Sequence, residues 1–328
     1  MGREHLLCYR RLRNVRVVAI CDSDKKRLKD GSKSAGNIGQ KGKSTGLAGI
    51  ALYTDFGKML ANEHLDAVSI TLPTFMHRAF TVKALNAGVN VLCEKPMAMS
   101  VRQCGEMISA ARENKKVLQI GHCIRFWPEY AKAKQIVDSG RYGRVLAASF
   151  RRIAPVPSWS WKNWLINAHK SGGAILDLHI HDSDFIQYLL GVPKAVRTQA
   201  IVGPSEGFDY ITTQYVYDGS KVVVAEGGFV KSAGFKFEMS FVILLDKATI
   251  VYDCRCKPSL LLYLAKGKSI APKIESGNGW SREIEHFINR IIGRKMPRII
   301  TPVDSLNAVK IVLAEKQSAR TNKEVSVR

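Results

Sequence analysis

The segment GGAILDLHIHDSDF, residues 172–185, places two histidines and three aspartates within a short apolar run. Such residues suit a metal site, acid–base catalysis from a buried helix, or an ordinary amphipathic helix. Asp177 and His181 are four residues apart, so on a helix they share one face and the carboxylate can orient the imidazole. A histidine held in this way can act as a general base. We expect Asp182 and Asp184 to make structural hydrogen bonds on the polar side of the same helix.

A metal-dependent hydrolase is the competing interpretation of this segment, because His179 and His181 would lie on one side of a β-strand at ligand spacing. A strand requires apolar residues that alternate with a period of two, and from Phe185 onward the apolar spacing is instead helical. On a helix, His179 and His181 point apart. The pattern therefore predicts one long helix over 170–191, entered through its glycine pair, and no metal site.

The composition limits the classes of partner. Fifty Lys and Arg against 28 Asp and Glu give a net charge of +22, which is typical of proteins that bind polyanions. The basic residues are spread along the chain without a known nucleic-acid-binding motif, so we expect no specific nucleic-acid partner. No apolar run approaches the roughly 20 residues of a membrane span, so we expect no membrane association. The seven scattered cysteines are typical of reduced thiols in a cytoplasmic protein.

Strand-like and helix-like segments alternate over residues 1–123. Apolar, β-branched runs end near residues 21, 73, 96 and 123, and helical patterns separate them. This alternation predicts an α/β domain, a Rossmann-like, doubly wound parallel sheet. Ligands bind beyond the carboxyl ends of the strands in such sheets. Those ends carry Asp22, Pro73, Thr74, Glu94, Lys95 and His122.

From residue 124 to 328 the pattern becomes that of a second, α+β domain. Apolar runs between 144 and 265 predict an open antiparallel sheet, with DG at 218–219 and EGG at 226–228 as turn signals. Helical patterns follow, and we expect the last one, over about 303–320, to pack back on the first domain.

The beginning of the chain bears on nucleotide binding. A dinucleotide-binding domain has a glycine-rich turn after its first strand and a ribose-binding acid about 20 residues later. Asp22 follows Gly2 at this distance, so Gly2 fits the third glycine of G-x-G-x-x-G. We expect that the first strand and the first two glycines are absent, and that the missing strand would lie between the strands at 15–21 and 66–72.

Four segments resemble the glucose–fructose oxidoreductase / inositol dehydrogenase family, also called Gfo/Idh/MocA: NVLCEKPMA, ITLPTFMH, IGHCIRFWPEY and SGGAILDLHIHDSDFIQYLLG. The resemblance extends in order and spacing over nearly the whole chain. It implies a nicotinamide-dependent oxidoreductase with NAD as cofactor and NADP as the alternative. The implied substrate is a sugar, an inositol or an anhydrosugar, and the implied assembly is a homodimer or homotetramer packed through the C-terminal sheet. A non-catalytic, regulatory protein of the same fold is the alternative.

The resemblance also implies roles for single residues. Lys95 matches the family's lysine beside the nicotinamide and the reacting hydroxyl, His181 its catalytic histidine, and Asp177 the acid that precedes it. These three residues, together with Arg125, are implied to bind the substrate. The cofactor-binding residues that the resemblance implies are Gly2, Asp22, Pro73, Thr74, His77, Glu94, Lys95 and Trp164.

Overall fold

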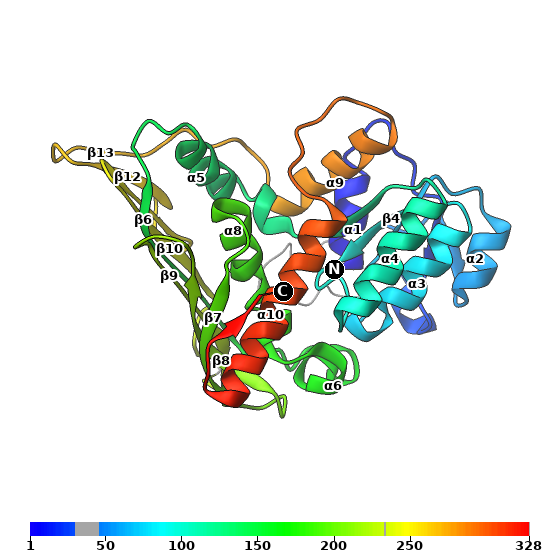
Figure 1. The fold of residues 1–328 in the computed structure, drawn as a ribbon. Helices are drawn as coiled ribbons and strands as arrows, with labels where there is room; N and C mark the ends of the chain where they lie inside the picture. The colour runs from blue at the N-terminus through cyan, green and yellow to red at the C-terminus, as the bar shows by residue number, and fades with distance from the viewer. Residues whose placement is uncertain (30–45, 233, 328) are drawn as a thin grey trace.

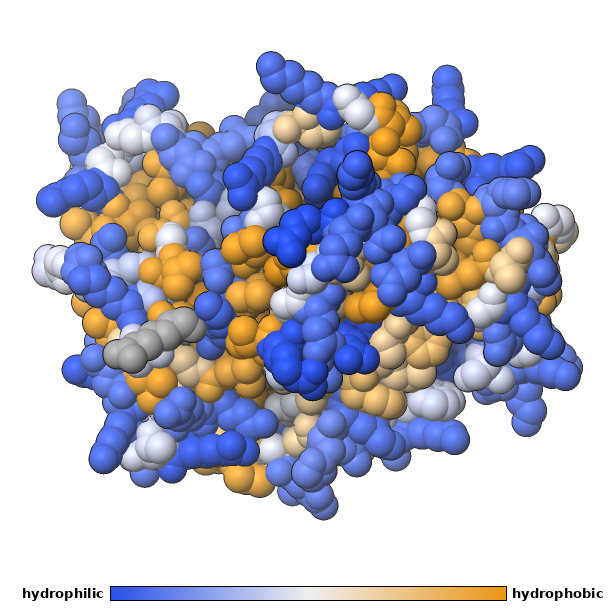
Figure 2. Space-filling view, turned by 45° about the vertical axis from the view of Figure 1, so that its right-hand side comes forward, coloured by the Kyte–Doolittle hydropathy of each residue, from blue (hydrophilic) through white to orange (hydrophobic). Residues whose placement is uncertain are grey.

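The computed structural model describes residues 1–29, 46–232 and 234–327. A group of parallel strands with its helices lies beside a large open sheet that carries helices on one face (Figure 1). Hydrophilic side chains cover much of the face shown in Figure 2, with apolar areas between them. No helix in the described ranges has the length and apolar character needed to cross a bilayer.

The N-terminal part confirms the predicted α/β fold. Each of its short parallel strands is followed by a helical segment or a loop that leads to the next strand. Its strands are β1 (Ala19–Cys21), β2 (Ala51–Tyr53), β3 (Ala67–Ile70), β4 (Asn90–Glu94) and β5 (Leu118–Gly121). Its helical segments are α1 (Gly2–Tyr9), η1 (Lys25–Leu28), α2 (Phe56–Asn62), α3 (Thr74–Asn86) and α4 (Val101–Glu113).

The five parallel strands form two sheets instead of one. β1 pairs with β2, and β3, β4 and β5 pair in that order, but no ladder joins β1 to β3 within the described residues. The division therefore lies between β1 and β3. Ala19, Cys21 and Tyr53 still pack against the same apolar core as β3 and β4, so side-chain packing holds the two sheets together.

The C-terminal part is built on a nine-stranded sheet in the order β13-β12-β11-β10-β6-β9-β8-β7-β14. The sheet is mixed and mostly antiparallel, because β6 pairs in parallel with β9. β9 and β10 run in opposite directions, so β6, which lies between them, must be parallel to one of the two. The strands are β6 (Val145–Pro155), β7 (Ala195–Val202), β8 (Phe208–Val216), β9 (Val222–Val230), β10 (Glu238–Leu245), β11 (Ala248–Asp253), β12 (Leu260–Leu264), β13 (Ser269–Ile270) and β14 (Val325–Ser326).

The EGG segment lies inside β9, so its prediction as a turn was wrong. A Cβ on Gly227 would lie 2.8 Å from Nδ1 of His179, and one on Gly228 would lie 2.4 Å from the carbonyl oxygen of Asp209. The two glycines therefore serve the close approach of a histidine and a neighbouring strand, a common use of glycine inside strands.

The single helix predicted over 170–191 is three helices: α6 (Ala168–Ser171), α7 (Ala174–Asp177) and α8 (Ile180–Leu190). The glycine pair interrupts it, because Gly172 and Gly173 have φ values of 85° and 79°, outside the helical region.

The hydrogen-bond register changes after Asp177, although Leu178 and His179 keep right-handed helical backbone angles. The amide of His179 donates to the carbonyl of Ala174, five residues back, and the amide of His181 donates to Leu178, only three residues back. No hydrogen bond joins the side chains of Asp177 and His181 among the described residues, and their sharing of one helix face stays a prediction.

Two buried ion pairs anchor α8. Asp182 accepts two hydrogen bonds from Arg152 of β6, at 2.8 and 2.9 Å. Asp184 accepts two from Arg125, at 2.8 and 2.7 Å, and Arg125 lies in the short turn η2 (Cys123–Phe126). All four side chains are at most 2 % exposed. The two aspartates make structural hydrogen bonds, as expected, but in the interior and not on a polar helix face.

The C-terminal helix α10 (Pro302–Thr321) lies between the two parts (Figure 1). Val309 and Val312 of α10 belong to the apolar core of the parallel strands, whereas Ile311 belongs to the core under the large sheet. This helix therefore fixes the two parts against each other. The remaining helices are η3 (Trp161–Ile166), α5 (Pro128–Asp138) beside the large sheet, and α9 (Gly279–Ile291), which packs on α1.

Candidate active site

The clearest functional contact joins the two parts of the molecule. Lys95 directly follows β4, and its Nζ donates hydrogen bonds to the backbone oxygen of Asp177 at 2.5 Å and to its Oδ1 at 3.1 Å. Both side chains are about one-sixth exposed. The structure therefore brings Lys95 and Asp177, two of the predicted catalytic residues, into a partly solvated ion pair.

His181 lies within the electrostatic reach of this pair. Its Nδ1 is buried and has no hydrogen-bond partner in the described part of the chain, although the side chain as a whole is partly exposed. Burial, followed by the positive charge of Lys95 and then that of Arg152, holds the pKa of His181 well below 6.5. The imidazole is therefore neutral at neutral pH and can accept a proton.

Arg125 and His122 lie behind this centre. The guanidinium of Arg125 donates to Asp184 and to the backbone oxygen of Ile299, so its donors are committed to structural partners. Nδ1 of His122 is 3.4 Å from Asp184, and burial lowers the pKa of His122. The role of Arg125 in substrate binding stays a prediction, which these contacts do not support.

His77 and Glu94, two of the residues expected to bind the cofactor, make buried hydrogen bonds near the carboxyl ends of β3 and β4. Both ring nitrogens of His77 lie 2.7 Å from carbonyl oxygens, one of Pro96 and one of Leu72, so this histidine clamps the segments that follow β3 and β4. Glu94 accepts hydrogen bonds from Nε2 of His5 at 2.9 Å and from the amide of Lys95 at 3.2 Å. His77 and Glu94 are buried and stabilise the edge on which Lys95 lies.

Three further residues that were expected to bind the cofactor are Pro73, Thr74 and Trp164. Pro73 caps α3, and Thr74 begins it with a buried hydroxyl that has no partner among the described side chains. Trp164 is partly buried in η3.

The remaining two positions lie on either side of the division in the sheet. Asp22, at the carboxyl end of β1, has a side chain that is one-third exposed, and its Oδ2 is 3.9 Å from Arg27. Gly2 begins α1, and a Cβ there would lie 3.0 Å from the Thr71 hydroxyl, so a larger residue would be crowded. An accessible carboxylate at the carboxyl end of a parallel strand can accept hydrogen bonds from the ribose of a dinucleotide.

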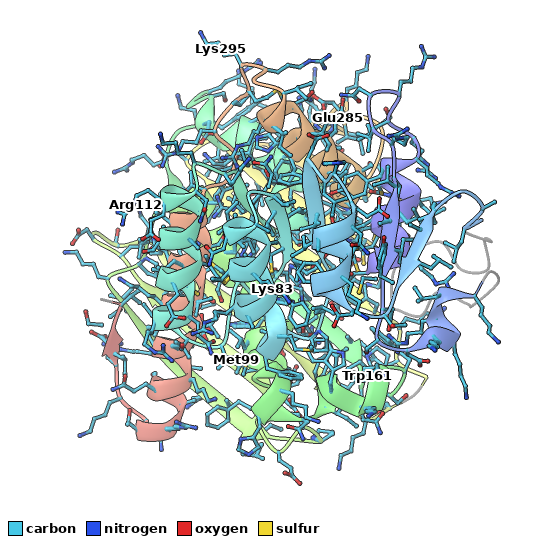
Figure 3. The ribbon with its side chains drawn as sticks, turned by 90° about the vertical axis from the view of Figure 1, so that its right-hand side faces the viewer. Lys83, Met99, Arg112, Trp161, Glu285 and Lys295 are labelled. Carbon is cyan, nitrogen blue, oxygen red and sulfur yellow. The ribbon has the colours of Figure 1, made fainter. Side chains whose placement is uncertain are left out.

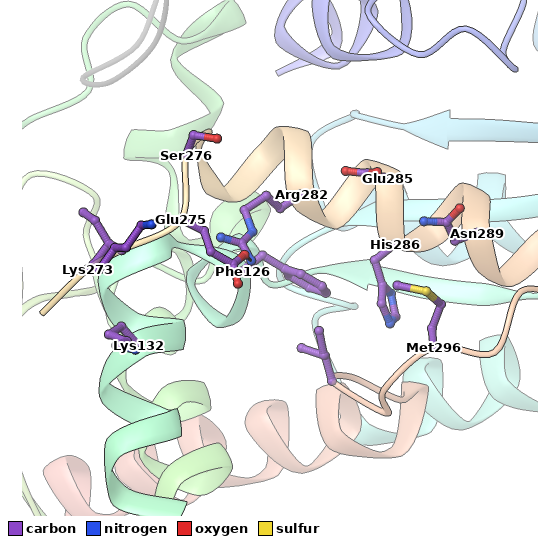
Figure 4. A pocket seen from close by; sticks show the side chains of 12 residues that line it. Phe126, Lys132, Lys273, Glu275, Ser276, Arg282, Glu285, His286, Asn289 and Met296 are labelled. Carbon is purple, nitrogen blue, oxygen red and sulfur yellow. Dashed lines mark hydrogen bonds and ion pairs between the residues drawn. The ribbon is translucent and has the colours of Figure 1, made fainter.

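A large cavity lies elsewhere in the described part of the chain. It has a volume of about 830 Å³ and contains none of the predicted site residues (Figure 4). A smaller one of about 290 Å³ is lined by Arg125 but not by Lys95 or His181. Neither cavity therefore includes Lys95, Asp177 or His181, the three residues of the candidate site. The residues that line the larger cavity include Phe126, Lys132, Lys273, Arg282, His286 and Asn289.

His179 and His181, the ligands of the alternative metal-dependent hydrolase, have different surroundings. His179 is fully buried, with Nε2 3.3 Å from the Tyr215 hydroxyl and 3.6 Å from Glu315 of α10. The one group of metal-ligating side chains within the described ranges does not include His179 or His181. The structure gives the metal-dependent hydrolase no ligand set at this place.

Sequence reasoning missed His5 and Arg152. His5 lies on α1, where it supports Glu94 from the side opposite Lys95. Arg152 lies on β6, pairs with Asp182 and contributes to the lowered pKa of His181. The G-x-x-H spacing of Gly2 and His5 was available as a signal, because it places the histidine on the first turn after the glycine.

Comparison with known proteins decides the family. Residues 1–122 match the model described as oxidoreductase family, NAD-binding Rossmann fold, and residues 130–251 match the GFO/IDH/MocA C-terminal domain. The chain belongs to the Gfo/Idh/MocA family. This confirms the resemblance seen in the EKP and GG…D-x-x-x-H-D segments.

Relatives and solved structures of this family are similar over different lengths. A 2,7-anhydro-N-acetylneuraminate hydratase of Mediterraneibacter gnavus is 34% identical over 63% of this chain and 56% of its own length. The D-glucoside 3-dehydrogenase of Escherichia coli is 27% identical over 98% of this chain and 93% of its own. The chain thus spans little more than half of the first relative.

The Gfo/Idh/MocA chain superposes on nearly the whole length of solved structures. Levoglucosan dehydrogenase, solved in complex with NADH and levoglucosan, superposes with a TM-score of 0.80 at 19% identity, covering 100% of this chain and 96% of the other. The myo-inositol 2-dehydrogenase of Lactobacillus plantarum gives a TM-score of 0.79 at 24% identity with the same coverage. These likenesses establish the shared architecture.

The neutral state of His181 can be measured directly. We expect its imidazole proton resonances in an NMR titration to have a midpoint well below 6.5, because burial and adjacent positive charge oppose protonation. Lys95→Met removes one of these charges and should raise the midpoint. His181→Ala assigns the resonance, because only the signal of this histidine should be lost in that variant. A midpoint for His181 at or above 6.5 would contradict the electrostatics described here.

Proposed function

We propose that this protein is an NAD-dependent oxidoreductase that transfers hydride between the cofactor and a secondary hydroxyl of a sugar, an inositol or an anhydrosugar. The observation that carries the proposal is the Lys95–Asp177 ion pair beside neutral His181, at the carboxyl ends of the parallel strands. Ligands of doubly wound sheets bind at this edge. The NAD-binding description of the matched family and the sugar-directed names of the relatives support the cofactor and the substrate class.

The residues at this centre can carry out alcohol oxidation. Loss of hydride from carbon must be accompanied by loss of the hydroxyl proton, and neutral His181 can accept that proton. The ammonium of Lys95, which Asp177 holds at 3.1 Å, can stabilise negative charge that develops on the oxygen. Bound NAD would supply the hydride acceptor, while Asp22 would hold its adenosine ribose.

A regulatory protein that binds the same ligands without turnover is the second candidate. The division between β1 and β3 favours it, because a continuous sheet would hold the two halves of a dinucleotide more rigidly. Turnover of NAD with any polyol or sugar separates the two candidates.

We also propose a cytoplasmic location for the protein and an assembly of two copies of the chain. All seven cysteines are free thiols, which supports a reducing, cytoplasmic compartment. The outer face of the large sheet exposes Leu146, Val242 and Leu244, each about two-fifths exposed, on the adjacent strands β6 and β10. We propose that this face pairs two copies of the chain, because exposed apolar patches mark protein interfaces.

The catalytic roles can be tested by substitution. His181→Ala and Lys95→Ala should each lower kcat by roughly 10²–10⁴, the usual effect of removing a proton-transfer or charge-stabilising group. The assay follows nicotinamide absorbance with myo-inositol, glucose and an anhydrosugar. The matched controls are the exposed His169→Ala and Lys83→Ala, the latter on α3 (Figure 3). Near-normal turnover of His181→Ala or of Lys95→Ala would refute the role proposed for that residue.

Cofactor choice depends on Asp22. Its carboxylate should accept hydrogen bonds from a ribose diol and repel a 2′-phosphate, so kcat/KM should be higher with NAD than with NADP. Asp22→Asn should reduce this preference by roughly tenfold, equivalent to about 1.4 kcal/mol. Asp24→Asn, two residues away, is the control and should leave the preference unchanged. A wild-type preference for NADP would show that Arg27 outweighs Asp22.

The assembly can be tested on the outer face of the sheet. Val242→Glu together with Leu244→Glu should convert the protein to a monomer in light scattering, because charges would be buried in an apolar interface. Val303→Glu, at an exposed apolar position of α10, should leave the oligomer intact. An unchanged mass for the double variant would exclude this face as the interface.

A further inference from the structure

A separate cluster of ligating side chains lies behind the EKP segment. His5 of α1, Glu94 of β4 and Glu283 of α9 each point one ligand atom toward the others, and these atoms all lie within 4.8 Å of one another. The three side chains are 1%, 6% and 0% exposed. The proposed hydride transfer does not use His5 or Glu283, so the cluster has no assigned role.

Glu283 is the unusual member. Both of its carboxylate oxygens are buried, and neither has a hydrogen-bond partner among the described residues. Leaving a buried polar group unpaired is unfavourable. Burial, and then the negative charge of Glu94, raise the pKa of Glu283 well above its ordinary value. Glu94 has positive groups nearby, His5 and Lys95 among them, whereas Glu283 has no hydrogen-bond partner among the described residues.

The other two members already have the surroundings of metal ligands. Nδ1 of His5 is 3.1 Å from the hydroxyl of Ser69, which in turn lies 2.8 Å from the hydroxyl of Tyr9. The second oxygen of Glu94 accepts the amide proton of Lys95. Metal-binding histidines and carboxylates are usually held by hydrogen bonds of this kind, which fix the ring orientation and the tautomer.

We propose that His5, Glu94 and Glu283 form a structural site for a divalent transition-metal ion of the zinc type. One imidazole nitrogen and two carboxylates are ligands that Zn²⁺ accepts, and a water molecule would complete a four-coordinate shell. Two carboxylates also neutralise the charge of the ion, which a buried site requires.

The geometry needs one small adjustment. Tetrahedral zinc with ligand distances of about 2.0–2.1 Å places the ligand atoms about 3.3 Å apart, so Glu283 must move by at most about 1.5 Å. On binding, Nε2 of His5 would turn from Glu94 to the ion, and the ring proton that it now donates to Glu94 would move to Nδ1, which faces Ser69. The ion would then join α1, β4 and α9 directly behind Lys95. This site goes beyond the proposed oxidoreductase activity, and its test does not depend on turnover.

The test is a metal titration of the purified full-length chain after chelator treatment. Calorimetry with Zn²⁺ should show one site with a Kd in the micromolar range or below, and the melting temperature should rise with metal. Glu283→Gln keeps the size of the side chain and should weaken binding by about 100-fold or more, since even outer partners of a metal site are worth 10–100-fold. Glu285→Gln on the exposed side of α9 is the matched control and should bind like the wild type (Figure 3).

X-ray absorption of the zinc-loaded wild type gives a second measurement that needs no variant. It should show nitrogen and oxygen ligands at about 2.0–2.1 Å, with an imidazole contribution and no sulfur. Sulfur in the shell would place the zinc on a cysteine and overturn the proposal. Equal affinities of the wild type and Glu283→Gln, or no binding at all, would also overturn it and would leave Glu283 as a buried carboxylic acid.

Discussion

The pairing of buried charges around α8 is the constraint on which the rest of the site depends. Arg152 and Arg125 bind Asp182 and Asp184 in the interior, where an unpaired charge would cost several kcal/mol. Because both partners of each pair are fixed, α8 cannot rotate or slide over β6 without breaking one of them. The position of His181, at the first turn of α8, is set by this arrangement.

The same charges influence the chemistry of the site. Arg152 is one of the positive groups that lower the pKa of His181, so the interaction that positions the histidine also keeps it neutral. Lys95 adds to this effect, and its own charge is balanced by Asp177 instead of by His181. In the proposed mechanism, the base His181 and the cation Lys95 are therefore separate groups, as alcohol oxidation requires.

The site is assembled from two parts of the molecule that are built differently. Lys95 comes from the end of a parallel strand, and Asp177 and His181 come from helices that lie on the large sheet. The helix α10, which contributes to both apolar cores, keeps these two parts in register. Oε2 of Glu315, on α10, also lies 3.6 Å from Nε2 of His179, which directly precedes α8. Buried polar groups as well as apolar side chains therefore connect α10 to the start of α8.

Properties that depend on local spacing were determined by the sequence alone. The alternation of apolar strands and helices predicted the α/β fold, and the EKP and GG…D-x-x-x-H-D segments predicted Lys95, Asp177 and His181. The backbone geometry within a segment was harder to predict from the sequence. An apolar helical pattern does not reveal that a glycine pair adopts positive φ, or that the hydrogen-bond register of the helix changes near residue 178. The polarity of 182 and 184 predicted hydrogen bonds, but not their burial.

Contacts between distant residues were decided only by the tertiary structure. Lys95 binds Asp177 from 82 residues away, and His5 binds Glu94 from 89 residues away. The partner of a charged residue cannot be predicted from the sequence, because many residues of opposite charge are available. Only the folded structure decides which of them form a desolvated pair. The sequence thus determined which groups could do the chemistry, and the packing of α8 and α10 decided which of them meet.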